Sequence, residues 1–400
     1  MVTRKCQLCG SDALEPVIDL GHHPLADTFL PPEALDDKEK TYPLRVLLCE
    51  CGYATLDVVV PAEERYQAMD YSYTASNSPV SVKHFSEMAK EMITRVGVTP
   101  DDLVVDVGSN DGTLLRAFRD QTGCRVLGVE PSGNIAAMAE QKGIPTLHEF
   151  FDSKAVEQIV SKGGAKAITA TNVYNHITDL NAFMADISRA LTNDGMFVFE
   201  APSLLELVSR TAFDTVYLEH VSYFGIKPLA RFYKKFGLHI HKIDLNDYMG
   251  GSMRVYVGKQ PAAATIVENF VRQEKAAGIY AHATYVAFMA RVRAFKSNLY
   301  RQIVEIKRRG GVIIAIGAAT KGNTLLNYCN LNRTLLECVT DSSPLKIGKI
   351  TPGSHLPIVA DADIPKNATH ALILPWNIGA FLKDKLKHLP LEFIVPHMGN

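Results

Sequence analysis

The sequence predicts an α/β protein: a doubly wound parallel sheet in the centre, a small cysteine-bearing segment before it and a second α/β unit after it. Three observations predict this fold class. Apolar runs alternate with helical segments between residues 80 and 260, a strand–glycine loop–helix pattern occurs at 103–115 and again from Gly311, and four of the seven cysteines lie near the N-terminus. Right-handed crossovers join such strands into a parallel sheet that binds its ligands at the carboxyl edge.

The N-terminal cysteines stand in two close pairs, C-x-x-C and C-x-C. Paired thiolates usually build a tetrahedral structural zinc site, because a small segment with little core needs a metal to fold. The second pair has one intervening residue where a zinc knuckle usually has two, so a simple knuckle would be strained. The alternative to a zinc site is a set of free buried thiols. The candidate ligands are Cys6, Cys9, Cys49 and Cys51, with His22 or His23 as substitutes.

The elements after this segment follow from their apolar periodicity. The strands expected in the central sheet are 103–107, 125–130, 144–147, 167–171 and 196–200. The runs 239–244 and 253–258 are expected to form an antiparallel hairpin that closes the sheet, and 262–309 carries a long helical pattern. The second unit is expected to use strands after Gly311 and at 336–340, 370–375 and 391–395.

The composition narrows the class of protein. Four hundred residues suggest two or three domains, and 47% hydrophobic residues are enough for real cores. The 42 basic and 43 acidic residues cancel, so no global field attracts nucleic acid or an anionic membrane. No apolar run approaches the about 20 residues of a membrane span, and the N-terminus lacks the apolar core of a signal peptide. The cysteines fit metal binding in a reducing compartment, and a cytoplasmic protein is expected.

The stretch LVVDVGSNDGTLL at 103–115 predicts a nucleoside site, because a glycine loop before a helix turns backbone N–H groups toward a ligand. A dinucleotide fingerprint needs a middle glycine for the pyrophosphate, but Asn110 and Asp111 stand there instead. Acidic surroundings suit a sulfonium, which points to S-adenosylmethionine (SAM) over NAD, and Glu130 is placed to bind ribose. The candidate cofactor residues are Asp106, Gly108, Ser109, Asn110, Asp111, Gly112, Glu130, Pro131, Asn134 and Asn172.

The second glycine loop, from Gly317 to Thr324, is not a phosphate-binding loop of the G-x-x-x-x-G-K-[ST] type, since Asn323 replaces the lysine. A helix N-terminus at residues 322–324, with Lys321 beside it, is still expected to hold a diphosphate. A packing unit that binds nothing is the alternative.

The whole chain resembles the sugar C-methyltransferases of deoxysugar biosynthesis, which act on TDP-4-keto-hexoses in antibiotic pathways. The resemblance rests on ordered blocks: the cysteine pairs, DLGHHPLADTFL, DYSYTASNS, DVGSNDGTLL, GVEPSGN, NVYNHITDL, YLEHVSYF, GGSMRVYVG, TKGNTLLNYC and TPGSHLPI. It implies a zinc-binding domain at 1–65, a SAM-dependent methyltransferase domain of class I type at 66–260 and a Rossmann-like nucleotide-sugar-binding domain at 261–400.

The resemblance also implies a reaction: a base removes the acidic proton beside the 4-keto group, and the enolate attacks the methyl sulfonium. His220 is the first candidate base and Glu219 its close rival. Tyr217 and His176 are expected to hydrogen-bond the enolate oxygen, and Tyr71 or Tyr73 to cover the sugar. Simple packing of His220 and Tyr223 is the alternative. The candidates for the nucleotide are Arg254, Lys321, Asn323, Thr324 and His355.

Two further function classes stay open. In an oxidoreductase, the C-terminal unit would bind NADPH with Asp341 on the ribose and reduce the ketone, alone or together with methylation. A zinc-anchored binding module without catalysis is the third class. C3 is favoured over C5 as the methylated carbon.

Overall fold

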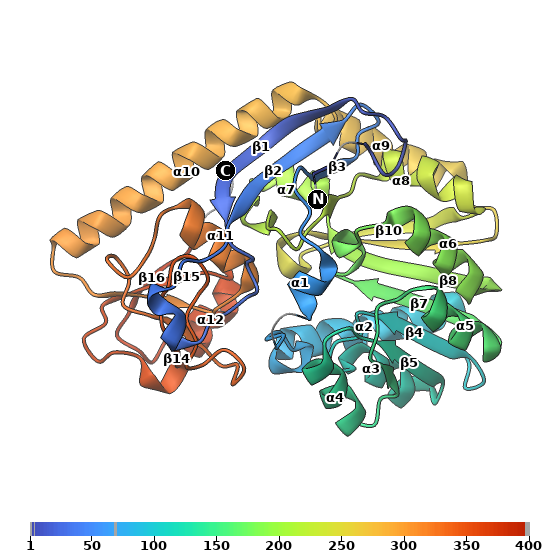
Figure 1. The fold of residues 1–400 in the computed structure, drawn as a ribbon, viewed down its shortest axis with the longest axis horizontal. Coiled ribbons are helices and arrows are strands. Elements are labelled where there is room, and N and C mark those ends of the chain that lie inside the picture. The colour runs from blue at the N-terminus through green and yellow to red at the C-terminus, as the bar shows by residue number, and fades with distance from the viewer. Residues whose placement is uncertain (1, 4, 68–69, 397–400) are drawn as a thin grey trace.

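The computed structural model describes residues 2–3, 5–67 and 70–396, and in these ranges the chain forms three sheets (Figure 1). The largest has seven strands in the order β10-β11-β8-β7-β4-β5-β6. Its parallel strands are β4 (Leu103–Val107), β5 (Arg125–Val129), β6 (Thr146–Leu147), β7 (Ala165–Thr171) and β8 (Leu191–Pro202). The predicted antiparallel hairpin is confirmed, and closes the sheet with β10 (His239–Asn246) and β11 (Ser252–Gly258).

Alternate residues of the central strands face two separate apolar clusters. Val104 packs in one cluster with Phe118 of α3 (Thr113–Thr122), and its neighbour Val105 packs in the other cluster with Ile159 of α5 (Ser153–Ser161). The helices of this part of the chain are α2 (Pro79–Val96), α3 (Thr113–Thr122), α4 (Gly133–Gln141), α5 (Ser153–Ser161), α6 (Leu180–Ala190), α7 (Leu204–Ser209) and α8 (Ile226–Tyr233). Helices on both faces make the sheet doubly wound, so the predicted fold class is confirmed.

The N-terminal segment is not the small, coreless unit that the cysteine spacing suggested. It forms a long hairpin of β1 (Leu14–His23) and β2 (Tyr42–Cys49). Strand β2 also pairs with β3 (Ala54–Leu56), and β3 pairs in turn with β9 (Ser222–Tyr223). The short helix α1 (Ala62–Tyr66) follows.

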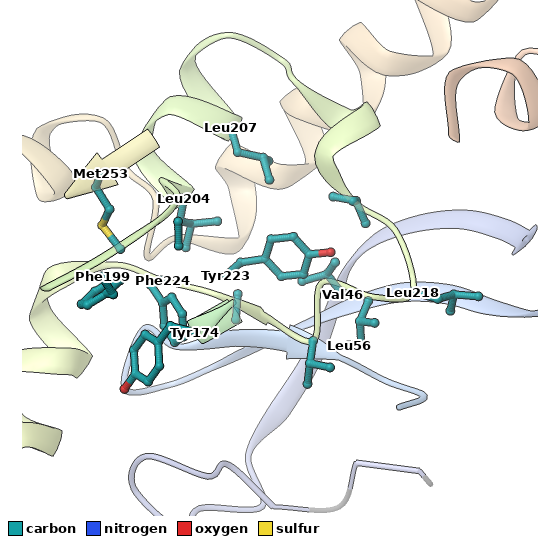
Figure 2. Close-up of a cluster of buried hydrophobic side chains, with 14 of the residues drawn as sticks. Val46, Leu56, Tyr174, Phe199, Leu204, Leu207, Leu218, Tyr223, Phe224 and Met253 are labelled. Carbon is teal, nitrogen blue, oxygen red and sulfur yellow. The ribbon is translucent and has the colours of Figure 1, made fainter. Parts of the chain in front are cut away.

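A shared core explains why this hairpin is held so firmly (Figure 2). Val46 of β2 and Leu56 of β3 pack in the same cluster as Phe199 of the central sheet, with the rings of Tyr174 and Phe224 stacked 4.8 Å apart. Burial of this kind contributes about 25 cal/mol for each Å² of apolar surface. The hairpin therefore shares its core with the central sheet and does not form a separate knuckle.

The C-terminal unit begins after two helices where one was expected. The pattern at 262–309 resolves into α9 (Ala264–Ala276) and α10 (His282–Arg308), because Gly278 takes a left-handed φ of +70° between them. The long helix α10 runs beside β1 along the outer edge of the molecule (Figure 1). None of the helices in the described part of the chain is long and apolar enough to cross a membrane.

A five-stranded parallel sheet in the order β14-β13-β12-β15-β16 forms this unit. Its elements are β12 (Ile313–Ile316), α11 (Thr320–Tyr328), β13 (Val339–Asp341), β14 (Ile358–Ala360), β15 (His370–Ile373), α12 (Gly379–Lys385) and β16 (Glu392–Ile394). Helix α11 starts at Thr320, two residues before the predicted N-terminus at 322–324, because the loop after Gly317 is shorter than expected. Asn323 and Thr324 therefore lie inside the first turns of the helix.

Candidate active site

One cavity of about 1160 Å³ connects the central sheet with the C-terminal unit. It is lined by the glycine loop after β4, the loops after β5 and β7, the segment 71–81, Tyr217 and His220, and the loops after β12 and β13. Pockets for single ligands measure about 300–1,000 Å³, so this space suits two ligands at once. Both ligands would lie at the carboxyl edges of parallel strands, where such folds bind.

The first glycine loop is shaped by left-handed backbone. Gly108 (φ +63°), Asn110 (φ +52°) and Gly112 (φ +76°) turn the chain from β4 into α3. A side chain at Gly108 would come within 2.4 Å of Val173, so only glycine fits this position. Gly108, Ser109 and Asn110 line the cavity, whereas Gly112 lies behind it against Ile144.

Two buried carboxyl groups face the cavity beside this loop. Glu130 follows β5, and its carboxylate accepts the N–H groups of Asn110 (3.0 Å) and Ser132 (2.9 Å). Burial raises the pKa of Asp106 to about 8, although the Thr169 hydroxyl donates to it across 2.6 Å. A carboxylate fixed by two backbone donors keeps lone pairs free for ribose hydroxyls, the arrangement expected for a nucleoside.

Two asparagine amides pin the segment 71–75 over the loop. Asn110 accepts the Ala75 N–H through Oδ1 and donates through Nδ2 to the Tyr73 carbonyl, at 2.9 and 3.0 Å. Asn134 donates to the Tyr71 carbonyl at 2.9 Å. Asn134 is not among the cavity-lining residues, so its amide holds the segment that covers the cavity.

Asp111 does not face the cavity. Its carboxylate pairs with Lys142 at 2.7 Å and accepts the Thr113 hydroxyl at 2.6 Å, which anchors the start of α3. The repulsion of a pyrophosphate expected from Asp111 is therefore cancelled by Lys142, and the acids that face the cavity are Asp106 and Glu130. Pro131 and Asn172 also line it, the latter in left-handed backbone (φ +54°) after β7.

His220 lines the cavity with one ring nitrogen left unprotonated. Its Nδ1 lies 2.8 Å from the Thr215 carbonyl, which can only accept, so the proton sits on Nδ1 and Nε2 keeps its lone pair. Burial lowers the pKa of His220 to about 3, which keeps the imidazole neutral. The Tyr217 ring lies 3.7 Å from the His220 ring and the His176 ring 5.0 Å from it, and all three line the cavity.

Glu219 lies behind this group. Its Oε1 accepts the Asp27 N–H at 2.9 Å, and its buried Oε2 has no partner among the described residues. Burial, with the nearby Asp27 carboxylate, raises the pKa of Glu219 to about 7. A carboxyl that titrates near neutrality beside a histidine is typical of catalytic sites.

Tyrosine rings enclose the same end of the cavity. Tyr66, Tyr71 and Tyr73 all line it, and the Tyr66 hydroxyl lies 2.6 Å from Nδ1 of His176. Burial lowers the pKa of His176 well below its ordinary value, with help from the charge of Arg65. Tyr71 and Tyr73, which were predicted to cover the sugar, thus line the same cavity as His176 and His220.

Lys321 lines the cavity from the C-terminal unit, at the start of α11. Its ammonium lies 4.3 Å from the centre of the Trp376 ring, and Trp376 donates to the buried Asp214 at 2.7 Å. Burial lowers the pKa of Lys321 to about 8. This amine is a cation that lines the cavity with little competition from water.

The other residues predicted to hold the nucleotide do not line the cavity. Asn323 donates to the Ala26 carbonyl, Thr324 donates to the Val216 carbonyl, and His355 pairs with Glu39 at 3.0 Å. Arg254 is buried in the sheet beside Glu200 and Glu91, each within 3.0 Å. These four side chains join parts of the protein to one another.

The sequence reasoning missed several groups at the site because their signal is only spatial. His84 of α2 lines the cavity and binds Glu200 at 2.7 Å, and Lys346 lines it near the second glycine loop. Arg65 of α1 donates to the carbonyls of His176 and Glu219 at 3.2 Å. No spacing in the sequence connects these residues, which come together only through the fold.

The four N-terminal cysteines form one cluster. Sγ of Cys6 lies 3.7 Å from that of Cys51, Sγ of Cys9 lies 3.5 Å from that of Cys49, and all four lie within 4.8 Å of one another. Four thiolates around a zinc ion at about 2.3 Å would be spaced by about 3.8 Å, so the cluster fits a tetrahedral site. His22 and His23 are not in it, and His23 instead contacts the Leu20 carbonyl.

Comparison with known proteins agrees with this anatomy. Family models match the chain at residues 6–66 ("Putative zinc binding domain"), 85–243 ("Methyltransferase domain") and 247–396 ("C-methyltransferase C-terminal domain"). C-methyltransferase NovU of Streptomyces niveus is 33% identical over 407 residues, which cover 98% of this chain and 95% of NovU. Sphingolipid C9-methyltransferase 2 of Gibberella zeae is 30% identical over 113 residues, 26% of this chain and 22% of that relative.

Among solved structures, a SAM-dependent methyltransferase from Clostridium acetobutylicum is 13% identical and covers 45% of this chain and 92% of its own, with a TM-score of 0.35. The doubly wound sheet, its glycine loop and the family models define the protein as a SAM-dependent methyltransferase. The identity over nearly the whole chain goes further: it belongs to the C-methyltransferase family that includes NovU.

Proposed function

We propose that the protein methylates a ring carbon, C3 favoured, next to the 4-keto group of a TDP-linked deoxysugar, in antibiotic deoxysugar biosynthesis. The observation that carries this proposal is His220, whose Nδ1 lies against the Thr215 carbonyl and which lines the same cavity as Glu130 and Lys321. Methylation at carbon needs a base that removes the proton from the reacting carbon. A binding site for SAM alone does not supply such a base. When bound, SAM supplies the methyl group.

His220 is the base in this proposal. Its Nε2 accepts the acidic proton beside the ketone, and the Thr215 carbonyl then stabilises the imidazolium through Nδ1–H. A positioned base contributes about 10²–10⁴-fold to the rate. Glu219 stays the rival base, because its pKa of about 7 lies nearer the pH of the reaction than the pKa of about 3 of His220.

Tyr217 and His176 stabilise the enolate oxygen by donating hydrogen bonds. Both are kept neutral: burial raises the pKa of Tyr217 well above its ordinary value and lowers that of His176. Tyr71 and Tyr73 cover the sugar and exclude water. The cofactor is held by the loop from Gly108 to Asn110 with Glu130 on its ribose, whereas Asp111 anchors the start of α3.

The nucleotide lies in the C-terminal part of the cavity, with Lys321 on the diphosphate. The other predicted contacts, Arg254, Asn323, Thr324 and His355, have no direct part in this proposal, because they do not line the cavity. In this proposal residues 1–65 bind the metal, residues 66–260 bind SAM, and residues 261–400 bind the nucleotide sugar.

The cysteine cluster would hold a zinc ion through Cys6, Cys9, Cys49 and Cys51. Four thiolates leave no open position, so the metal would cross-link the chain and take no part in catalysis. Metal analysis of the purified protein should find one zinc per chain.

Solvent exchange tests the proposed base. In D₂O with S-adenosylhomocysteine bound, the protein should exchange the hydrogen beside the ketone of a TDP-4-keto-6-deoxyhexose for deuterium, and His220→Asn should abolish the exchange. His241→Asn is the matched control, because His241 is half-buried, lies against the Gln260 carbonyl and does not line the cavity. Exchange that survives in His220→Asn and stops in Glu219→Gln would transfer the role to Glu219.

A second candidate function rests on Asp341. Its carboxylate lines the cavity and accepts the N–H groups of Ala318 and Ser343, both at 2.7 Å, as a ribose-binding acid does. The protein would then also reduce the keto sugar with NADPH. Loss of NADPH absorbance with the keto sugar would support this activity, and no binding of NADPH would exclude it.

A further inference from the structure

The segment 24–30, which follows β1, lies between the C-terminal unit and the loop that carries His220. Asp27 in this segment is 9% exposed, and Phe29 is 2% exposed. The Ala26 carbonyl accepts the Asn323 amide at 2.7 Å, and Leu30 pairs with Ile350 through two backbone hydrogen bonds. The segment is thus fixed to the C-terminal unit on both sides of Asp27, at Ala26 and at Leu30.

Asp27 connects three groups of that site. Its backbone N–H donates to Oε1 of Glu219 at 2.9 Å, and its Oδ1 accepts the hydroxyl of Thr320 at 2.9 Å. Its carboxylate also lies near the Tyr71 hydroxyl, and after burial its charge is the next cause that raises the pKa of Tyr71 well above its ordinary value. Thr320 and Tyr71 both line the cavity, Thr320 from the C-terminal unit and Tyr71 from the segment before α2, whereas Asp27 does not line it. Asp27 therefore acts on the site through its neighbours.

The charge of Asp27 also reaches Glu219. Burial is the larger cause of the raised pKa of Glu219, and the Asp27 carboxylate is the next. Arg65 acts in the opposite direction with its positive charge. The titratable and charged groups around Glu219 are Asp27 from the segment after β1, Arg65 and Tyr66 from α1, Tyr71, and Tyr217, His220 and Tyr223 from its own loop and β9.

We propose that Asp27 is a positioning residue for methyl transfer: it holds Glu219, Tyr71 and Thr320 in one register, so that the nucleotide side of the cavity is aligned with the methyl-transfer side. This inference rests on the proposed function and adds a residue from outside the predicted catalytic block. Misplacement of reacting groups by about 1 Å costs about 10²-fold in rate, so alignment of this kind affects kcat more than binding.

Substitutions at Asp27 separate shape from charge. Asp27→Asn keeps an oxygen for Thr320 but removes the charge, whereas Asp27→Ala removes both. The controls Asp19→Asn and Asp19→Ala lie on the same hairpin, where the exposed Asp19 only accepts the Gly21 N–H. The measurements are kcat and KM with a TDP-4-keto-6-deoxyhexose, the pH profile of kcat, the Kd of S-adenosylhomocysteine and the melting temperature.

We expect Asp27→Ala to lower kcat at least thirtyfold, with KM and Kd within threefold of wild type. Asp27→Asn should recover most of this loss, and the limb of the pH profile that belongs to Glu219 should move to lower pH by about half a unit or more, because a like charge is gone. That limb moves in this direction whether Glu219 works as an acid or as a base. A merely structural residue would not move it.

Two results would overturn the inference. The first is an Asp27→Asn variant in which neither kcat nor the pH profile changes. The second is an Asp27→Ala variant whose loss of activity is explained entirely by its lower melting temperature. If Asp27→Ala does not fold, Thr320→Val decides together with Asp27→Asn: it removes one hydrogen bond and leaves the charge, so kcat should fall while the pH limb stays. If the wild-type protein transfers no methyl group, the proposed function fails as well. The assay of the wild-type protein alone therefore separates failure of the proposed function from failure of the inference about Asp27.

Discussion

The two glycine loops of the molecule are built alike and surrounded differently. In each, an acid after the second strand accepts a loop N–H: Glu130 from Asn110 at 3.0 Å, and Asp341 from Ala318 at 2.7 Å. Each acid also accepts the N–H two residues further on, and each loop begins with a left-handed glycine, Gly108 or Gly317.

The surroundings of the two loops differ in charge. Of the four lysines that line the cavity in the described part of the chain, Lys321, Lys346 and Lys385 belong to the C-terminal unit, and Lys83 lies on α2. The first loop has carboxyl groups and no lysine of its own facing the cavity. The same backbone design therefore suits a phosphate-free sulfonium nucleoside at the first loop and a phosphate-bearing nucleotide at the second.

The largest effect should come from removing one acid and not the other. Glu130→Ala should weaken S-adenosylhomocysteine binding about 100-fold, because hydrogen bonds to a charged group contribute about 1.5–3 kcal/mol each. Asp341→Ala is the matched control, and should leave this Kd within twofold while it raises KM for the sugar nucleotide. Calorimetric titration of both variants checks the contrast, and equal losses would end the distinction between the loops.

A smaller effect should follow from adding a methyl group to each loop. Gly108→Ala puts a Cβ 2.4 Å from Val173, and Gly317→Ala puts one 2.7 Å from Pro375, both at positive φ. Strain of this kind costs about 1–3 kcal/mol, so both melting temperatures should fall. Only Gly108→Ala should also lose affinity for S-adenosylhomocysteine, by about 30-fold.

The smallest effect concerns pH. Burial lowers the pKa of Lys321 to about 8, so the amine is charged below this pH and neutral above it. kcat/KM for the sugar nucleotide should therefore fall by up to about tenfold from pH 7 to pH 9, since kcat/KM reports the free enzyme. Lys321→Met should lower the value at pH 7 and remove this decrease, and an identical decrease in the variant would assign it to another group.

The fold could be predicted from local patterns, and the first loop with it. The strands 103–107 and 239–244 are apolar runs between clear turns, so periodicity was sufficient. The roles of single side chains could not be predicted in the same way. Arg254 and Asp111 carry charges that suggest ligands, but each is paired inside the protein, with Glu200 and with Lys142.

Asp27 and Arg65 show the converse. Both lie far in sequence from residues 217–220, and only the packing of the N-terminal hairpin on the central sheet brings them to Glu219. Long-range contacts of this kind have no spacing that a single sequence reveals. The four cysteines were recognised because metal ligands come in close pairs, even though the hairpin beside them packs in one core with the central sheet.

The most direct test of the account is the fate of a labelled methyl group. The protein would be incubated with SAM carrying a ¹³C-methyl group and with a TDP-4-keto-6-deoxyhexose, and the product examined by NMR. The account predicts a ¹³C-methyl signal bonded to a ring carbon next to the ketone, and its loss in His220→Asn. A methyl signal bonded to oxygen, or no transfer by wild-type protein that binds both ligands, would contradict it.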